Sequence, residues 1–68
     1  MARLGIEARA RVAAEADLLR RRKAEFERLC KRNDRNAAIV AMIEKHKDEY
    51  GQLVRAYRDR LEAAESAA

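Results

Sequence analysis

Proline is absent from this sequence, and glycine, cysteine and aromatic residues are scarce. The 68 residues include two glycines, one cysteine, one phenylalanine and two tyrosines. Because there is only one cysteine, an intramolecular disulfide framework is excluded. No apolar run approaches the roughly 18 residues that a membrane span requires, so we expect no membrane partner. With no proline and few glycines, little in the chain interrupts a helix.

Charged residues are abundant instead, and they are unevenly distributed. They make up 41% of the sequence, beside 49% hydrophobic residues, and the formal net charge is +4. This composition is typical of long helices with a large exposed surface. Residues 1–36 carry eleven Lys or Arg against six Asp or Glu, whereas residues 37–68 carry five against six. The start of the chain has no apolar signal-peptide core, so we expect a cytoplasmic protein.

One helix-breaking cluster, at residues 31–36, separates two long runs rich in helix-forming residues. Folding the chain back there predicts an all-α, two-helix antiparallel hairpin that forms a single domain over residues 1–68. We expect helices over about 3–32 and about 37–65, joined by a turn at about 33–36. Asn33 suits the end of the first helix, and Asp34 or Asn36 suits the N-cap of the second. No internal repeat stands out.

Apolar residues recur at helical spacing in both runs, which predicts the faces that pack together. One side of the first helix carries Leu4, Ala8, Val12, Ala16, Leu19, Phe26 and Cys30. Folding the chain back pairs Val12 with Tyr57, Ala16 with Leu53, and Cys30 with Ile39. Since it faces Ile39 in this pairing, Cys30 is expected to be a small buried hydrophobe with no catalytic role.

These apolar faces predict association between copies of the chain. The face of the first helix spans about 160°, which is wider than the seam of a two-stranded coiled coil, and Val40 and Val54 broaden the face of the second helix. A chain this short rarely obtains much stability from its own core, so we expect a homodimer that forms a four-helix bundle. A monomeric hairpin would expose Leu18, Leu29, Val40 and Val54. The competing architecture is one continuous helix about 100 Å long in an extended coiled coil.

A group of basic residues lies within about 100° on the side of the first helix away from its apolar face. It consists of Arg9, Arg20, Arg28, Lys31 and Arg35. Such a face could bind a polyanion, nucleic acid or an acidic partner, with strong salt dependence. The alternative is an ordinary solvated face, since acidic residues lie close to it and no aromatic residue interrupts it.

His46 is the one polar residue in the apolar stripe of the second helix. The fold-back pairing places it level with Lys23, and Arg22 also falls within the apolar arc of the first helix. One interpretation is a polar core layer of Arg22, Lys23 and His46 that specifies the helix register. The other is that both cations extend outward and leave His46 half-exposed. Glu49 is the only nearby companion for a metal, so we expect no metal site.

The sequence predicts a class of function rather than a particular activity. It contains no glycine-rich phosphate loop, no serine nucleophile motif and no CxxC, so we expect no enzyme and no cofactor. The first hypothesis is a protein–protein interaction module, such as a small adaptor, assembly factor, co-chaperone or inhibitor. The second is a nucleic-acid-binding regulator that uses the basic face of the first helix.

Overall fold

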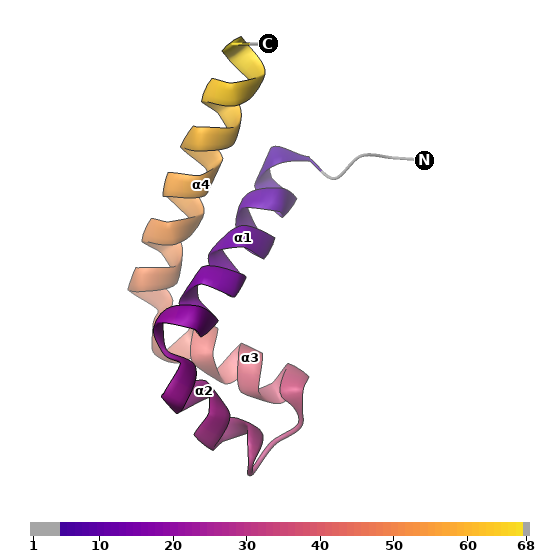
Figure 1. The fold of residues 1–68 in the computed structure, drawn as a ribbon, viewed down its shortest axis with the longest axis vertical. Coiled ribbons are helices and arrows are strands. Elements are labelled where there is room, and N and C mark those ends of the chain that lie inside the picture. The colour runs from indigo at the N-terminus through magenta and orange to yellow at the C-terminus, as the bar shows by residue number, and fades with distance from the viewer. Residues whose placement is uncertain (1–4, 68) are drawn as a thin grey trace.

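The fold is all-helical over residues 5–67, which are the residues that our computed structural model describes. They form α1 (Ile6–Arg21), α2 (Lys23–Cys30), α3 (Arg35–Lys45) and α4 (Lys47–Ala67), and this part of the chain contains no strand. As Figure 1 shows, α1 lies beside α4 and α2 lies beside α3. Residues 1–4 and 68 lie outside the described residues. They include Leu4 and the predicted start of the first helix near residue 3.

The chain reverses direction between α2 and α3. Asp34 caps α3, because its Oδ1 accepts a hydrogen bond of 2.8 Å from the backbone N–H of Ala37. The backbone N–H of Asn33 donates to the carbonyl of Leu29, which closes the end of α2. Salt bridges join Arg9 to Glu65 and Arg22 to Glu49, so α1 and α4 run in opposite directions.

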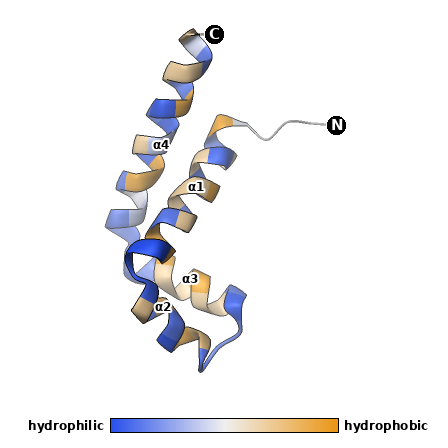
Figure 2. Cartoon of the chain, in the orientation of Figure 1, coloured by the Kyte–Doolittle hydropathy of each residue, from blue (hydrophilic) through white to orange (hydrophobic). Residues whose placement is uncertain are grey.

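Each of the two predicted helices is interrupted by a kink. The helix expected over about 3–32 ends at Arg21 and resumes at Lys23, and Arg22 between them has φ −120° and ψ 42°. The helix expected over about 37–65 is divided in the same way at His46, with φ −112° and ψ 41°. The first kink lies in the run of four basic residues that forms a blue band in Figure 2. Neither kink contains proline or glycine, the commonest causes.

Small and medium apolar residues form the core on both sides of the kinks. Between α1 and α4, Ala14, Leu18 and Leu53 form one cluster, against which Tyr50 and Tyr57 pack. Ala38 and Met42 of α3 are also fully buried, as are Ala10 of α1 and Leu18. Burying Leu18 and Met42 completely contributes roughly 1.5–3 kcal/mol for each side chain.

The predicted apolar stripe of the first helix faces outward in α1. Val12, expected to meet Tyr57, has 62% of its surface exposed, and Ala16 is exposed as well. Leu53 packs against Ala14 and Leu18 instead. The predicted pairing was therefore wrong along α1, because alanines occur on nearly all sides of this helix and two opposite faces can both serve as an apolar face.

The exposure of individual apolar residues also departs from the expectation. Leu18 is fully buried within one chain, whereas Val40 is 56% exposed. Leu29 and Val54 are half-buried. The longest dimension of the molecule is 44 Å, and the chain is not the continuous helix of about 100 Å. Within residues 5–67, no helix is long and apolar enough to cross a membrane.

Cys30 is exposed, so its prediction as a buried hydrophobe was wrong. It is the last residue of α2, beside the turn. We expect a thiol reagent to label Cys30 in the folded protein nearly as fast as it labels a short unfolded peptide. Cys30→Ser should change the free energy of unfolding by less than about 0.5 kcal/mol. Labelling that becomes fast only in denaturant would contradict this placement.

Candidate functional site

Two crossed side-chain pairs join the kinks. The Nε of Arg22 donates to Oε1 of Glu49 at 2.7 Å. Nε2 of His46 lies 3.0 Å from Oε1 of Glu25 and 3.1 Å from Oε2. Each kink residue therefore contacts the glutamate that follows the other kink by three positions. These contacts couple the place where α1 meets α2 to the place where α3 meets α4.

Glu25 is the most heavily engaged carboxylate of this region. The Nζ of Lys45 approaches its Oε2 at 2.8 Å, in addition to the contact with His46. Only 18% of the Glu25 side chain is exposed, compared with 13% for His46. The hydrogen bond from Lys45 and then that from His46 lower the pKa of the Glu25 carboxyl, although its partial burial acts in the opposite direction.

The three residues of the predicted polar core layer have different surroundings. His46 is half-buried and faces Glu25, whereas Lys23, its expected neighbour, is exposed. Arg22 is half-buried and extends across to Glu49 in α4. The polar groups at this level thus include two carboxylates, those of Glu25 and Glu49. The sequence interpretation missed Glu25, and it considered Glu49 only as a companion of His46, since it assumed two uninterrupted helices with a fixed register.

An offset of 24 residues aligns the two kinks and several of the residues around them, a correspondence that we call the internal repeat and that the sequence interpretation did not identify. His46 follows Arg22 by 24 residues (46 minus 22), and the two kinks have nearly the same backbone angles. The same offset relates α1–α2, which we call the first arm, to α3–α4, the second arm. The matching pairs are Ala14 and Ala38, Leu18 and Met42, Arg22 and His46, Lys23 and Lys47, Glu25 and Glu49, Phe26 and Tyr50, and Leu29 and Leu53. The repeated basic-Lys-x-Glu-aromatic pattern was the available signal.

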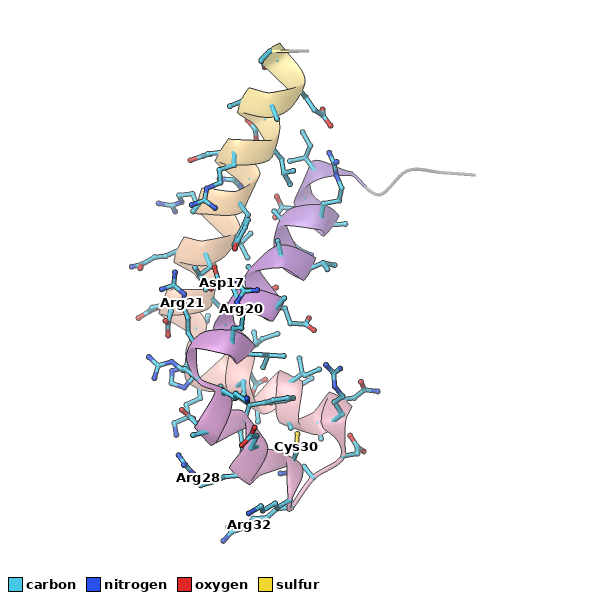
Figure 3. The ribbon with its side chains drawn as sticks, in the orientation of Figure 1. Asp17, Arg20, Arg21, Arg28, Cys30 and Arg32 are labelled. Atoms are coloured by element: carbon cyan, nitrogen blue, oxygen red, sulfur yellow. The ribbon has the colours of Figure 1, made fainter. Side chains whose placement is uncertain are left out.

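A second polar cluster surrounds Asp17, which is buried between α1 and α4. Its Oδ1 accepts a hydrogen bond of 2.8 Å from Nε of Arg21, and its Oδ2 accepts one of 2.7 Å from the Tyr57 hydroxyl. Arg20 approaches the same carboxylate at 3.5 Å. The hydrogen bond from Arg21 and then that from Tyr57 lower the pKa of Asp17. Figure 3 shows Asp17, Arg20 and Arg21 grouped beside α4.

The predicted basic face is divided among several surroundings. Arg9 is bonded to Glu65 at 2.7 Å, and Arg20 is paired with Asp17. The guanidinium of Arg35 lies over the ring of Phe26, 5.9 Å from its centre. Arg28 and Lys31 instead line a hollow at the end of the molecule formed by α2 and α3. The structure therefore brings only two of the five residues together.

The hollow measures about 550 Å³, and it combines cations with apolar residues. Its lining residues are Glu25, Arg28, Leu29, Lys31, Arg32, Ala41 and Lys45. Within residues 5–67, no acidic residue forms a salt bridge with Arg28, Lys31 or Arg32. Arg28 and Arg32 extend away from the ribbon in Figure 3. The hollow can therefore receive an anion next to an apolar group.

Comparison with known proteins returned no match to a protein-family model, a curated protein or a solved structure. Among residues 5–67, no group of three or more His, Cys, Asp or Glu side chains is placed to hold a metal ion. The candidate site is consequently defined by the hollow between α2 and α3 and by the charged groups around it.

Proposed function

We propose that the chain is a non-enzymatic protein–protein interaction module, of the class of small adaptors, assembly factors, co-chaperones or inhibitors. The observation that carries this proposal is the hollow between α2 and α3, where cations surround a partly apolar surface. Concave surfaces with apolar walls and a few convergent polar groups are typical binding sites. Three of these cations, Arg28, Lys31 and Arg32, form no salt bridge within the part of the chain that the structure describes, which favours a docked protein with acidic groups.

The module acts as a homodimer of kinked helical hairpins. Ala8, Val12, Ala16 and Leu19 follow one another at spacings of four, four and three residues and so share one face of α1. This face points away from α4, and Val12 and Ala16 on it are exposed. Two copies that pack these faces together would bring two α1 helices and two α4 helices into a four-helix bundle.

Sedimentation at micromolar concentration tests the dimer. We expect the wild-type chain to sediment with twice its 7.8 kDa mass, and Val12→Glu to sediment as one chain with unchanged helicity. Val12→Glu should leave the fold intact because it places a charge at a position that is 62% exposed within the chain. Val40→Glu is the matched control, and it should remain dimeric. A wild-type mass of one chain with full helicity would contradict the dimer.

A nucleic-acid-binding regulator is the alternative function. It is favoured by the concentration of Arg28, Lys31 and Arg32 at one end of the molecule. Against it, Phe26 is covered by Arg35, and Tyr57 packs in the core, so these rings do not offer a stacking surface for bases. Phosphate contacts alone would give salt-dependent binding without sequence preference.

Affinity capture from the native host distinguishes the two functions. A tagged chain should recover the same protein partner before and after nuclease treatment of the extract. Substituting Arg28 and Lys31 with Glu should remove that partner, whereas the same change of charge at Lys47 and Arg55 of α4 should not. Recovery of nucleic acid, with proteins that disappear after nuclease treatment, would support the alternative. Recovery of neither would contradict both functions.

A further inference from the structure

The internal repeat shows which side chain lies between α4 and α1, at the position that corresponds to the hollow between α2 and α3. Leu29 and Ala41 line the hollow between α2 and α3, and their counterparts between α4 and α1 are Leu53 and Asp17. There the ring of Tyr57 packs against the cluster that contains Leu53, and its hydroxyl donates to Asp17 at 2.7 Å. An aromatic side chain from the same chain thus fills that half.

Two substitutions between the arms explain why the half with the hollow stays open. The counterpart of Tyr57 is Asn33, which lies in the turn, and its Nδ2 donates back to the carbonyl of Leu29 at 3.1 Å. The counterpart of Asp17 is Ala41, which has no carboxylate to accept a hydroxyl group. Leu29 and Ala41 therefore give the hollow an apolar wall, and within residues 5–67 no aromatic side chain lines it.

The charges around the hollow determine which groups can bind beside an aromatic ring that enters it. The one carboxylate among its lining residues, Glu25, already accepts hydrogen bonds from Lys45 and His46. Arg28, Lys31 and Arg32 form no salt bridge with an acidic residue inside the described range 5–67. Arginine and lysine in this arrangement bind carboxylates through charge-assisted hydrogen bonds.

We propose that the hollow binds an acidic peptide segment of a partner protein, which inserts one phenylalanine onto Leu29 and Ala41 and places its carboxylates against Arg28, Lys31 and Arg32. The proposal rests on the interaction-module function and specifies its partner. Phenylalanine is favoured over tyrosine, because Ala41 replaces the group that accepts the Tyr57 hydroxyl. A volume of about 550 Å³ accommodates one aromatic side chain together with the adjoining peptide backbone.

Fluorescence anisotropy with defined peptides tests this assignment at low ionic strength. The probe is a labelled synthetic peptide with one Phe between runs of alternating Glu and Ser. Two matched peptides replace Phe with Gly, or every Glu with Gln. We expect the probe to bind the wild-type chain, and each matched peptide to bind more weakly by about tenfold or more. Equal binding of the Gly peptide would indicate charge attraction alone, and no binding of the probe would overturn the proposal.

Substitutions in the protein locate the bound peptide. Ala41→Phe fills the hollow without changing the charge of the protein. It should weaken the binding of the probe peptide by about tenfold or more. Ala56→Phe, at an exposed position of α4, is the matched control and should leave binding unchanged. Circular dichroism of both variants verifies the fold. If Ala41→Phe loses helicity, Arg28→Glu compared with Arg55→Glu provides the second test, and equal binding by those two variants overturns the proposal.

Further probes separate this assignment from the broader function. Two other ligands are tested for binding: vesicles that contain phosphatidylserine, and a duplex RNA. If Ala41→Phe loses binding to one of these ligands but binds the peptide as the wild-type chain does, the hollow is assigned to that ligand instead. If Ala41→Phe fails to bind the peptide but still recovers the nuclease-resistant partner from the host, the module stands and the hollow is not its docking site. If no such partner exists, the module itself fails.

Discussion

Leu18→Ala is expected to remove most of the free energy of unfolding. Leu18 is fully buried where α1 packs on α4, in the cluster with Ala14 and Leu53. Truncating a buried leucine to alanine costs about 3 kcal/mol, because transfer free energy is lost and a cavity remains. A domain of this size rarely obtains more than about 3–5 kcal/mol from its core, so this loss is comparable with the whole stability. Urea unfolding followed by circular dichroism measures the effect.

The internal repeat supplies a matched variant for this experiment. Met42 is the counterpart of Leu18, is also fully buried, and also precedes a kink by four residues. Met42→Ala should therefore destabilise the protein by a similar amount, about 2–5 kcal/mol. Val40→Ala, at a position that is 56% exposed, should change the free energy of unfolding by less than about 0.5 kcal/mol. Equal effects of Leu18→Ala and Val40→Ala would contradict the described core.

The helical class and the site of chain reversal could be predicted from local features of the sequence. Asp34 was one of two candidate caps, and it binds the N–H of Ala37 as an N-cap residue does. Abundant alanine and the scarcity of glycine and proline favoured helix on either side of it. These features depend on a few neighbouring residues, so they do not require knowledge of how the helices pack.

The register and the packed faces could not be predicted in the same way. A kink at Arg22 changes the direction of the helix, so a single apolar stripe calculated for an unbroken helix does not persist across it. The pairing of His46 with Glu25, rather than with Lys23, depends on both kinks at once. The hollow depends on the difference between Asn33 and its counterpart Tyr57, which becomes visible only after the two arms are aligned.

Acidification is expected to destabilise the protein through Asp17 and Glu25. Cationic and hydrogen-bonding neighbours lower the pKa of both carboxyls in the folded state. A group whose pKa is lower in the folded state stabilises the fold above its unfolded pKa, and this contribution disappears as the pH falls through the folded pKa. The stability from these two groups is therefore complete at neutral pH and decreases below about pH 4.5, where the unfolded chain binds protons first.

Denaturant unfolding at a series of pH values between neutral and strongly acidic tests this linkage. Replacing Asp17 with Asn and Glu25 with Gln should lower stability at neutral pH and reduce proton uptake on unfolding below pH 4.5 by up to about one proton for each group. The control replaces Glu44 and Asp59, which are exposed, with their amides and should retain nearly the wild-type pH dependence of stability.

Asp17 connects α1 to Tyr57 of α4, and Glu25 connects α2 to the kink at His46. Because the two groups bond across different helix pairs, the single variants should reduce the acid dependence additively, and an unchanged dependence in the double variant would show that these contacts do not stabilise the fold.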